Sequence, residues 1–509
     1  MKLPEKLQER RHAVPPLDSR QRPEQPGIMQ TREYYPLMTI IRHISFAIII
    51  AVTLAACCGC REEAAKGLPT QDGKKLIEVS VFQGGYGIDF WQKCAADYEK
   101  LHPDVKVNIW GDPRNDEKLR PRFIAGTPPD LVYANLPVWI LIAAKQCYPL
   151  NKFLDEPPYA DSRGAGLPRG AGVSPANPAG ETPAPRVADT WRDTLLPMAY
   201  RDFTQEGECY ALNVPYAIYG FWCDRKQFRQ HRWQTPKTWD EFLALCERIK
   251  NEGIDPIAFQ GRYPTYITSL FETLVQRMGG TEKWLALQNM EPGAWTDPVV
   301  IKALEMVQEL RKRDYIPASY MGLSHMESQM KFVQGKAAMI PCGTWLATEM
   351  KSSTPEGFEY GFIPYPSPAG SVGDTTAIIA SGEYWFVPAH ANYPEIGADM
   401  LRFVTSLQNA KGFVQSKRAL FAVKGAEENP PPALAEAVDA LHAAKFTFTS
   451  QVSSWYKTFD ASYNEVCGNL LSLDWTPQQC ADYLEKAAGA QRRDKRTKLH
   501  KMLNPETGK

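Results

Sequence analysis

The sequence predicts an α/β protein whose sheets are open and mostly parallel. Strand and helix patterns alternate from Leu76 to Asn135, which implies right-handed βαβ units. The 509 residues are too many for one ordinary core, so two or three domains are expected. Ligands of open α/β sheets bind beyond the carboxyl ends of the strands. The residues that follow each strand are therefore the first candidates for a binding site.

Three strands and two helices are predicted in this stretch. The first strand breaks at Gly84-Gly85, and the apolar residues of Ile88–Leu101 then recur at helical spacing. Val105–Trp110 alternates as a strand, and the second helical pattern ends at Gly126-Thr127-Pro128-Pro129. Asp130–Asn135 is a short apolar run, typical of a strand covered on both faces. We expect Asp130 to pin the Pro-Pro turn rather than to touch a ligand.

The N-terminal region predicts an export signal. Residues 1–37 are a polar extension without periodicity, and we expect translation to start at Met38. The apolar core of residues 44–58 is shorter than the roughly 20 residues of a membrane span. Leu54-Ala55-Ala56-Cys57 resembles a lipobox, so residues 38–60 are predicted to be a lipoprotein signal peptide with Cys57 lipidated. Cys58 or Cys60 as the lipidated residue, and a retained N-terminal anchor, are the alternatives.

Charge and cysteine usage exclude several classes of protein. Lys and Arg total 58, as do Asp and Glu, and this balance gives no support for a nucleic-acid surface. Eight cysteines follow Cys60, none in a C-x-x-C pair, so a zinc ribbon or redox motif is unsupported. In an exported protein one or two disulfides would be possible.

The second half of the chain repeats the alternation of strands and helices. Pro157–Pro185 is rich in Gly, Ala and Pro and is predicted to be a disordered insertion, with a functional linker as the alternative. Further on, Thr238 is a predicted N-cap for an amphipathic helix that ends at Gly253. A strand ends at Gln260-Gly261, and helices follow from Tyr263.

Several segments carry a family resemblance. Four segments carry it: WGDPRNDEKLRPRFIAGTPPDLVYAN, YAIYGFWCDRKQF after Pro215, KTWDEF, and MESQMKFVQGKAAMIPCGTWLATEM. They resemble family 1 of the extracellular solute-binding proteins that serve ABC sugar importers. The resemblance covers about residues 74–490. It implies a two-lobed periplasmic-binding-protein type II fold, each lobe an open, mostly parallel sheet flanked by helices. The expected boundaries are a tether at 61–73, lobe one at 74–215, lobe two at 216–375, a return to lobe one at 376–424, a helical part of lobe two at 425–491, and a charged tail at 492–509 that frays.

A sugar site needs aromatic plates for stacking and planar polar groups for hydrogen bonds. Trp345 follows the glycine-led end of a strand and is the leading candidate for a plate, although tryptophan is more often buried in a core. Asn135 and Gln260 are the stronger polar candidates for ligand binding, because each ends a predicted strand. The other candidates, each with a core or solvated-loop role as the alternative, are Tyr86, Asp112, Arg114, Tyr219, Trp222, Tyr263, Glu383 and Trp385.

No catalytic motif stands out. The sequence has no G-x-S-x-G, H-E-x-x-H or P-loop pattern, and its eight histidines are dispersed. The resemblance implies a monomeric protein in the periplasm or at the cell surface, held there by a lipid anchor. Such a protein captures a mono- or oligosaccharide in an interlobe cleft by hinge closure. It then delivers the sugar to the membrane subunits of an ABC importer. No metal or organic cofactor, no nucleic acid and no enzymatic activity are expected. The alternatives are an exported glycan-degrading enzyme and a carbohydrate sensor or adhesion module without transport.

Overall fold

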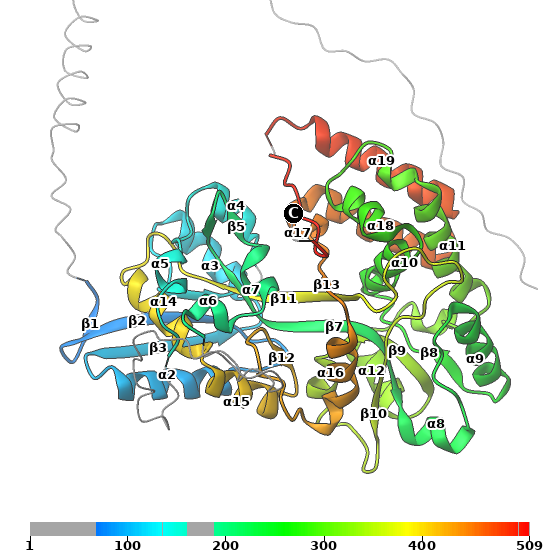
Figure 1. Cartoon of the computed structure of the whole chain (residues 1–509), viewed down its shortest axis with the longest axis horizontal. Helices are drawn as coiled ribbons and strands as arrows, with labels where there is room; N and C mark the ends of the chain where they lie inside the picture. Colours follow the sequence, from blue (N-terminus) through cyan, green and yellow to red (C-terminus); the bar gives the residue numbers. More distant parts are fainter. Residues whose placement is uncertain (1–67, 135, 160–187, 497, 508–509) are drawn as a thin grey trace, which may run out of the picture. The chain divides into compact units, whose positions relative to one another are not determined.

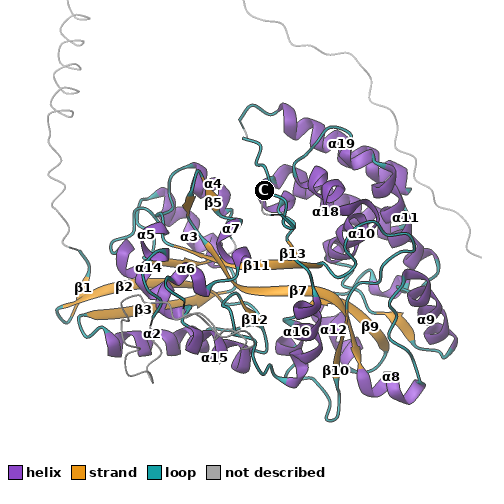
Figure 2. Ribbon diagram, in the orientation of Figure 1, coloured by secondary structure: helices purple, strands orange, loops and turns teal. Residues whose placement is uncertain are grey.

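A computed structural model describes residues 68–134, 136–159, 188–496 and 498–507. Two groups of helices flank a sheet system, and two long strands run between the groups (Figure 1 and Figure 2). The strands are β1 (Thr70–Gln71), β2 (Lys74–Phe82), β3 (Val105–Asp112), β4 (Leu131–Tyr133), β5 (Thr204–Gln205), β6 (Glu208–Cys209), β7 (Leu212–Asp224), β8 (Asp255–Ile257), β9 (Ala337–Gly343), β10 (Tyr360–Ile363), β11 (Ile378–Phe386), β12 (Leu420–Phe421) and β13 (Thr447–Phe448).

Parallel pairing dominates the first lobe, as predicted. There β2 pairs in parallel with both β3 and β4. In the second lobe β8 and β9 are also parallel. The long strands β7 and β11 are antiparallel to each other and join the two halves, because β11 also pairs with β4 and β7 also pairs with β9 and β10. The return strand β11 begins at Ile378, which agrees with the predicted crossing.

The helices cover both faces of the sheets. In the first lobe they are α2 (Asp89–Leu101), α3 (Asn115–Ile124), α4 (Val138–Ala143), α5 (Asn151–Leu154), α6 (Trp191–Thr194), α7 (Pro197–Arg201), α14 (Pro394–Val404) and α15 (Leu407–Lys417). In the second they are α8 (Arg225–His231), α9 (Trp239–Asn251), α10 (Thr268–Gln288), α11 (Pro298–Lys312), α12 (His325–Val333), α13 (Leu346–Glu349), α16 (Ala435–Ala443), α17 (Val452–Trp455), α18 (Lys457–Ser472) and α19 (Pro477–Arg493). Short 3-10 turns lie at Pro264–Ile267, Ala294–Thr296, Ala318–Tyr320 and Pro432–Leu434.

Local sequence signals explain how these elements begin and end. The Thr238 hydroxyl accepts a hydrogen bond from the Glu241 amide at 3.2 Å, and the Glu241 carboxylate accepts one from the Thr238 amide, so the predicted N-cap is a full capping box. Asp130 is buried and accepts hydrogen bonds from the Glu78 and Tyr393 amides. Its expected role in fixing the turn before β4 is confirmed.

Three segments differ from the sequence-based expectation. Thr70 and Gln71, within the predicted tether, pair with β2. Tyr159, within the predicted insertion, packs against Phe403 and donates a hydrogen bond to Asp399 at 2.6 Å. The predicted tail does not fray over residues 498–507, because the Met502 amide donates a hydrogen bond to Asn289 Oδ1 at 2.6 Å. The rest of the insertion, from residue 160, and the signal segment with Cys57 lie outside the described residues.

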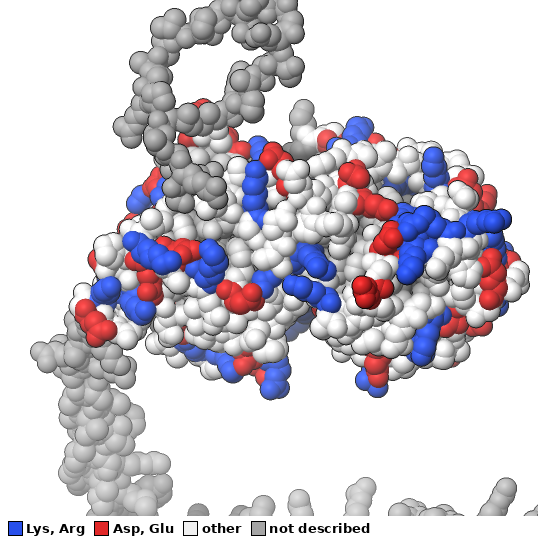
Figure 3. Space-filling model, turned by 90° about the horizontal axis from the view of Figure 1, so that it is seen from below, with Lys and Arg blue, Asp and Glu red and all other residues white. Residues whose placement is uncertain are grey.

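The eight cysteines after Cys60 are all buried and free, so none of the possible disulfides forms among them. Within the described ranges no helix is long and apolar enough to cross a membrane. Positive and negative side chains are interspersed over the face in Figure 3, in keeping with the balanced charge.

Candidate functional site

A cavity of about 400 Å³ opens in the second lobe beside the strands that join the lobes. We name it the lobe-two cavity. Its wall includes the middle of β7, the start of α10, residues 379–381 of β11, and the segment from β13 into α18. Its volume lies within the range of roughly 300–1,000 Å³ that is common for ligand sites.

Aromatic rings form one wall of this cavity. The Trp345 ring stands edge-to-face against Tyr219, with ring centroids 5.4 Å apart and planes at 84°. Tyr266 approaches the same indole at 6.4 Å. Trp345 is half-buried, so one part of the ring is held by its neighbours and another part is open to the cavity. This arrangement is compatible with the stacking plate expected at Trp345, which stays a prediction.

Gly343 allows this placement of Trp345. It ends β9, and a side chain at this position would collide with the Trp345 indole. The ring therefore folds back over the end of its own strand, and only the absence of a Cβ lets it do so. The glycine that led us to Trp345 in the sequence thus has a steric role as well as a turn role.

Polar side chains also line the lobe-two cavity. The Glu272 carboxylate accepts hydrogen bonds from Ser450, Tyr463, Trp284 and Gln288, at 2.8, 3.2, 2.9 and 3.0 Å. Burial raises the pKa of Glu272, while these four hydrogen bonds oppose the rise. The network holds these hydroxyl groups in fixed positions, which is the preorganisation that selective hydrogen bonding needs.

A second polar group lies where the two lobes meet. We name Tyr86, Tyr133, Glu349 and Glu383 the cleft cluster. The Tyr133 hydroxyl donates a hydrogen bond to Glu383, and the Gln329 amide donates one to Glu349 at 2.8 Å. A Cβ at Gly85, in the loop after β2, would lie 3.1 Å from the Glu349 side chain. The first lobe therefore reaches the second at the carboxyl end of β2, the edge predicted for ligand binding.

Burial controls the ionisation of the cleft cluster. It raises the pKa of Glu383 to about 7 and also raises the pKa of Glu349. It raises the pKa of Tyr86 as well, and the nearby Glu383, Tyr219 and Glu349 add to that rise. No Lys or Arg makes an ion pair with either carboxyl group within the described part of the chain. Burial thus favours the protonated form of both carboxyl groups, and each accepts a hydrogen bond from a neighbouring side chain.

Three predicted ligand residues belong to the interior instead. Trp222 is 1% exposed and donates a hydrogen bond to the Cys342 carbonyl at 3.1 Å. Trp385 is also 1% exposed and stacks on Tyr133, with centroids 4.9 Å apart and planes at 12°. Gln260 is fully buried and donates to the Pro341 carbonyl at 3.2 Å. All three side chains therefore pack in the interior and do not line the lobe-two cavity.

Asp112, Arg114 and Tyr263 lie at the surface. Asp112 accepts a hydrogen bond from the Arg114 amide at 2.7 Å and pairs with Lys118. The Arg114 side chain is 77% exposed, and Tyr263 is 46% exposed beside His325. None of the three lines the lobe-two cavity. Asn135 lies outside the described residues.

The structure therefore brings together Trp345 and Tyr219 in the lobe-two cavity, and Tyr86 and Glu383 in the cleft cluster. Sequence reasoning missed Glu272, Ser381, Ser450 and Tyr463. Ser381 shares a hydrogen bond of 2.7 Å with Tyr219. Only a β-strand serine next to Gly382, and a glutamate in an otherwise apolar helix face, signalled these positions.

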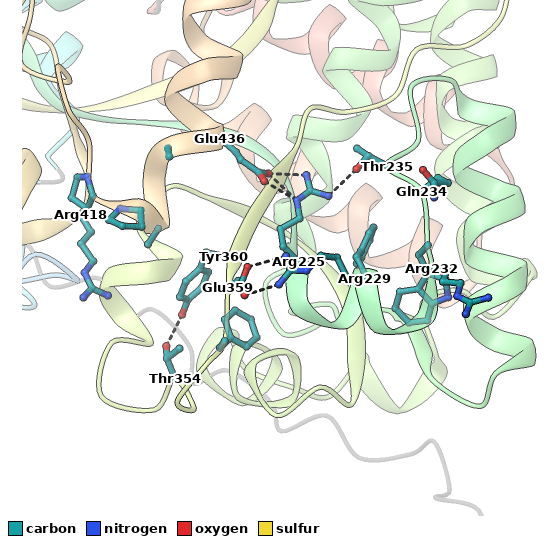
Figure 4. Close-up of a pocket in the computed structure, with 17 residues that line it drawn as sticks. Arg225, Arg229, Arg232, Gln234, Thr235, Thr354, Glu359, Tyr360, Arg418 and Glu436 are labelled. Atoms are coloured by element: carbon teal, nitrogen blue, oxygen red, sulfur yellow. Dashed lines mark hydrogen bonds and ion pairs between the residues drawn. The ribbon is translucent and has the colours of Figure 1, made fainter.

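A larger hollow in the second lobe has a different chemistry. A pocket of about 1,160 Å³, which we name the arginine pocket, lies beneath α8 and β10. Figure 4 shows Arg225 directed at Glu436 and Arg229 directed at Glu359. The Arg225–Glu436 pair has N–O distances of 2.7–3.0 Å, and the Arg229–Glu359 pair has 2.6 and 2.9 Å. These pairs balance the charges of Arg225 and Arg229, while Arg232 and Arg418 of the same pocket have no ion pair among the described residues.

The model of the bacterial extracellular solute-binding protein family matches residues 84–411, more than half of the chain. The chain belongs to this family. The matched region includes α2, both strands that join the lobes, Trp345 and the cleft cluster. The family resemblance predicted from the sequence is confirmed.

Relatives and solved structures of this solute-binding family agree with the fold. The chain is 26% identical over 358 residues to the diacetylchitobiose-binding protein NgcE of Streptomyces coelicolor, covering 69% of this chain and 70% of the relative. It resembles a chitin oligosaccharide-binding protein at 19% identity, with a TM-score of 0.64 and coverage of 82% and 99%. It also resembles the apo form of RafE from Streptococcus pneumoniae at 16% identity, with a TM-score of 0.64 and coverage of 83% and 100%. The two-lobed fold is confirmed.

Proposed function

We propose that this solute-binding protein captures a carbohydrate between its lobes and delivers it to the membrane subunits of an ABC importer. The observation that carries the proposal is the lobe-two cavity, which is lined both by the Trp345 ring and by the serine and tyrosine hydroxyls that bond to Glu272. A pyranose offers apolar C–H faces and polar hydroxyl edges, and these two kinds of lining group complement them. The sugar-binding names of several relatives support the same ligand class.

Closure of the lobes would complete the site. Tyr86 from the first lobe and Glu349 from the second belong to the same cluster, and β7 and β11 join the lobes through paired backbone. Ligand contacts to both lobes would favour the closed form, as in other hinge proteins. The first lobe then comprises residues 74–215 and 376–424, and the second comprises 216–375 and 425–491. Binding proceeds without turnover of the sugar.

The protein acts at the outer side of the membrane as a lipid-anchored monomer. The support is the sequence Leu54-Ala55-Ala56-Cys57 after a short apolar core. The anchor would keep the binding lobes close to the importer. Mass spectrometry of the mature N-terminus should find an acylated Cys57, whereas an unprocessed Met1 or Met38 would contradict this part of the proposal.

A thermal-shift screen tests the ligand class. Mono- and oligosaccharides are added to the purified protein, and any binder should raise the melting temperature with increasing concentration. At a concentration of about 100 times Kd, the gain in unfolding free energy is about 2.7 kcal/mol. A panel in which no sugar changes the melting temperature would contradict the proposal. Release of smaller glycans on incubation would favour a glycan-degrading enzyme, and unchanged uptake after gene deletion would favour a sensor.

A further inference from the structure

The single helical turn α13 connects the lobe-two cavity with the first lobe. Trp345, which lines the cavity, directly precedes this turn, and Thr348 and Glu349 follow it by three and four residues, so all three lie on the same side of the turn. The Trp345 carbonyl accepts hydrogen bonds from the Thr348 and Glu349 amides at 2.9 and 3.0 Å. The indole and the two side chains therefore belong to one hydrogen-bonded unit.

Thr348 contacts the first lobe. Its hydroxyl donates a hydrogen bond to the carbonyl of Lys417, the last residue of α15. Carbonyls in the last turn of a helix have no partner within that helix, so the second lobe supplies one here. Lys417 is itself held in place, because it is buried and its ammonium group pairs with Asp89 at the start of α2.

Glu349 meets the first lobe at a second point. The Gln329 amide of α12 donates a hydrogen bond to the Glu349 carboxyl group at 2.8 Å and so fixes the side chain. On its other side lies Gly85, where an added Cβ would be 3.1 Å from Glu349. Tyr86, the next residue of this loop, packs edge-to-face against Phe413 of α15, with ring centroids 5.3 Å apart. The loop after β2 and the helix α15 therefore form one surface that receives α13.

The turn itself belongs to the second lobe. It follows β9 after only two residues, and Leu346, Ala347 and Met350 are fully buried. We therefore expect α13 to move with the second lobe, so that both of its contacts with the first lobe break when the lobes separate. Because the Trp345 carbonyl holds the amides of Thr348 and Glu349, a shift of either contact also shifts the indole.

We propose that Thr348 and Glu349 are positioning residues that couple closure of the lobes to the orientation of the Trp345 ring. This inference rests on the proposed carbohydrate function and names the element that regulates it. A sugar stacked on Trp345 favours the closed form through α13, and closure in turn orients the ring for stacking, because a coupling between two binding events is reciprocal. The apparent affinity for the sugar then depends on the fraction of protein in which these contacts are formed.

The test uses the full chain, with calorimetric titration for Kd and stopped-flow fluorescence for the rate constants. The probes are the two-ring and five-ring members of the β-1,4-N-acetylglucosamine, β-1,4-xylose and α-1,4-glucose series. Thr348→Val removes the hydroxyl and keeps the shape of the side chain, whereas Thr348→Ser keeps the hydroxyl. Thr354→Val is the matched control, because the Thr354 hydroxyl bonds to the Met350 carbonyl at 2.8 Å and to the Tyr360 hydroxyl at 2.7 Å, both within the second lobe.

We expect Thr348→Val to weaken sugar binding about fivefold, since one neutral hydrogen bond changes an equilibrium constant roughly 2- to 13-fold. The loss should appear as faster dissociation with an unchanged association rate, because the bond forms only on closure. Thr348→Ser and Thr354→Val should stay within about twofold of the native Kd. Gly85→Ala tests the same surface from the first lobe, and its added methyl group, pressing on Glu349, should also weaken binding.

A double substitution shows whether Thr348 acts through the ring. In the Trp345→Ala background, Thr348→Val should weaken binding by less than about twofold, because the group that it positions is gone. Additive losses would overturn the inference. A lower melting temperature with an unchanged Kd would also overturn it, since Thr348 would then have a structural role alone. Binding of no probe by the native chain would instead refute the proposed function itself.

Discussion

The second lobe contains two hollows, and the larger of them is the less suited to binding a sugar. The arginine pocket has nearly three times the volume of the lobe-two cavity, 1,160 against 400 Å³. Two of its arginines, Arg225 and Arg229, are paired with glutamates at 2.6–3.0 Å, whereas Arg232 and Arg418 have no ion pair among the described residues. The lobe-two cavity has less room, yet both the Trp345 ring and the hydroxyls that bond to Glu272 line it.

The carboxyl groups show the same contrast. Arg229 lowers the pKa of Glu359 in the arginine pocket. The negative charge of the Glu359 carboxylate is therefore balanced by the Arg229 guanidinium. Burial raises the pKa of Glu383 in the cleft cluster to about 7, and Tyr133 is its hydrogen-bonding partner. A site is recognised by groups that still have binding capacity rather than by volume alone. Four substitutions test this contrast.

Trp222→Ala should have the largest effect, and the effect should be on stability. Trp222 is buried, its ring lies 6.1 Å from the Tyr360 ring of the arginine pocket, and its indole N–H donates a hydrogen bond to the Cys342 carbonyl. Truncating a buried tryptophan costs about 3–5 kcal/mol of unfolding free energy. Urea unfolding measures this. A loss below about 1 kcal/mol would mean that the ring is not part of the core.

Trp345→Ala should weaken sugar binding by about 1–3 kcal/mol, or roughly 5- to 150-fold, because a stacking plate is lost. Its effect on unfolding should be smaller than that of Trp222→Ala, since the ring is only half-buried. Calorimetric titration and a melt on the same samples give both values. An unchanged Kd with a collapsed melting temperature would assign Trp345 to the core and remove it from the site.

Glu383→Gln should change how stability depends on pH. The folded protein keeps a proton on Glu383 up to pH about 7, while the unfolded chain loses it near pH 4.5. The stability contribution of this proton is therefore complete below pH 4.5 and is lost as the pH rises through 7. The variant has no such proton to lose, so between pH 5 and 8 it should gain on the order of 1–2 kcal/mol of unfolding free energy relative to the native chain.

Urea unfolding of both proteins across that pH range measures the difference. Other carboxyl groups titrate in both proteins and cancel in the comparison. A difference that stays constant with pH would show that Glu383 is ionised throughout. It would also remove the contrast with the paired Glu359.

Arg229→Ala should have the smallest effect. The Arg229 and Glu359 side chains are 62% and 50% exposed, so their ion pair is screened by solvent. We expect no measurable change in melting temperature and none in sugar affinity. A clear loss of affinity with Arg229→Ala but not with Trp345→Ala would transfer the ligand site to the arginine pocket.

Local patterns predicted the elements well. The period of Ile88–Leu101 predicted α2, the Thr238 cap predicted α9, and the alternation at 105–110 predicted β3. Such signals lie within one element, so they can be read without knowing the rest of the fold. Trp345 was found in the same way, because Gly343 and the strand before it are its neighbours in the chain.

The rest of the site depends on contacts between distant segments. Glu272 meets Ser450 and Tyr463, which lie 178 and 191 residues further along the chain. No local pattern encodes such a meeting. Trp385 and Gln260 have residue types that suit a sugar site and positions near strand ends, but tertiary packing buries both. The C-terminal residues were expected to fray because they are charged, whereas the His500 ring packs against the indoles of Trp139 and Trp455.

The free cysteines have a consequence for the biogenesis of the protein. All eight are buried, and burial raises the pKa of every one, to about 12 for Cys94 and Cys223. Thiolates are the reactive form, so the folded protein is protected from oxidants without forming a crosslink. The export predicted from the N-terminal segment would carry the same eight thiols, before the lobes fold, into an oxidising compartment where mispaired disulfides can form until burial protects the thiols.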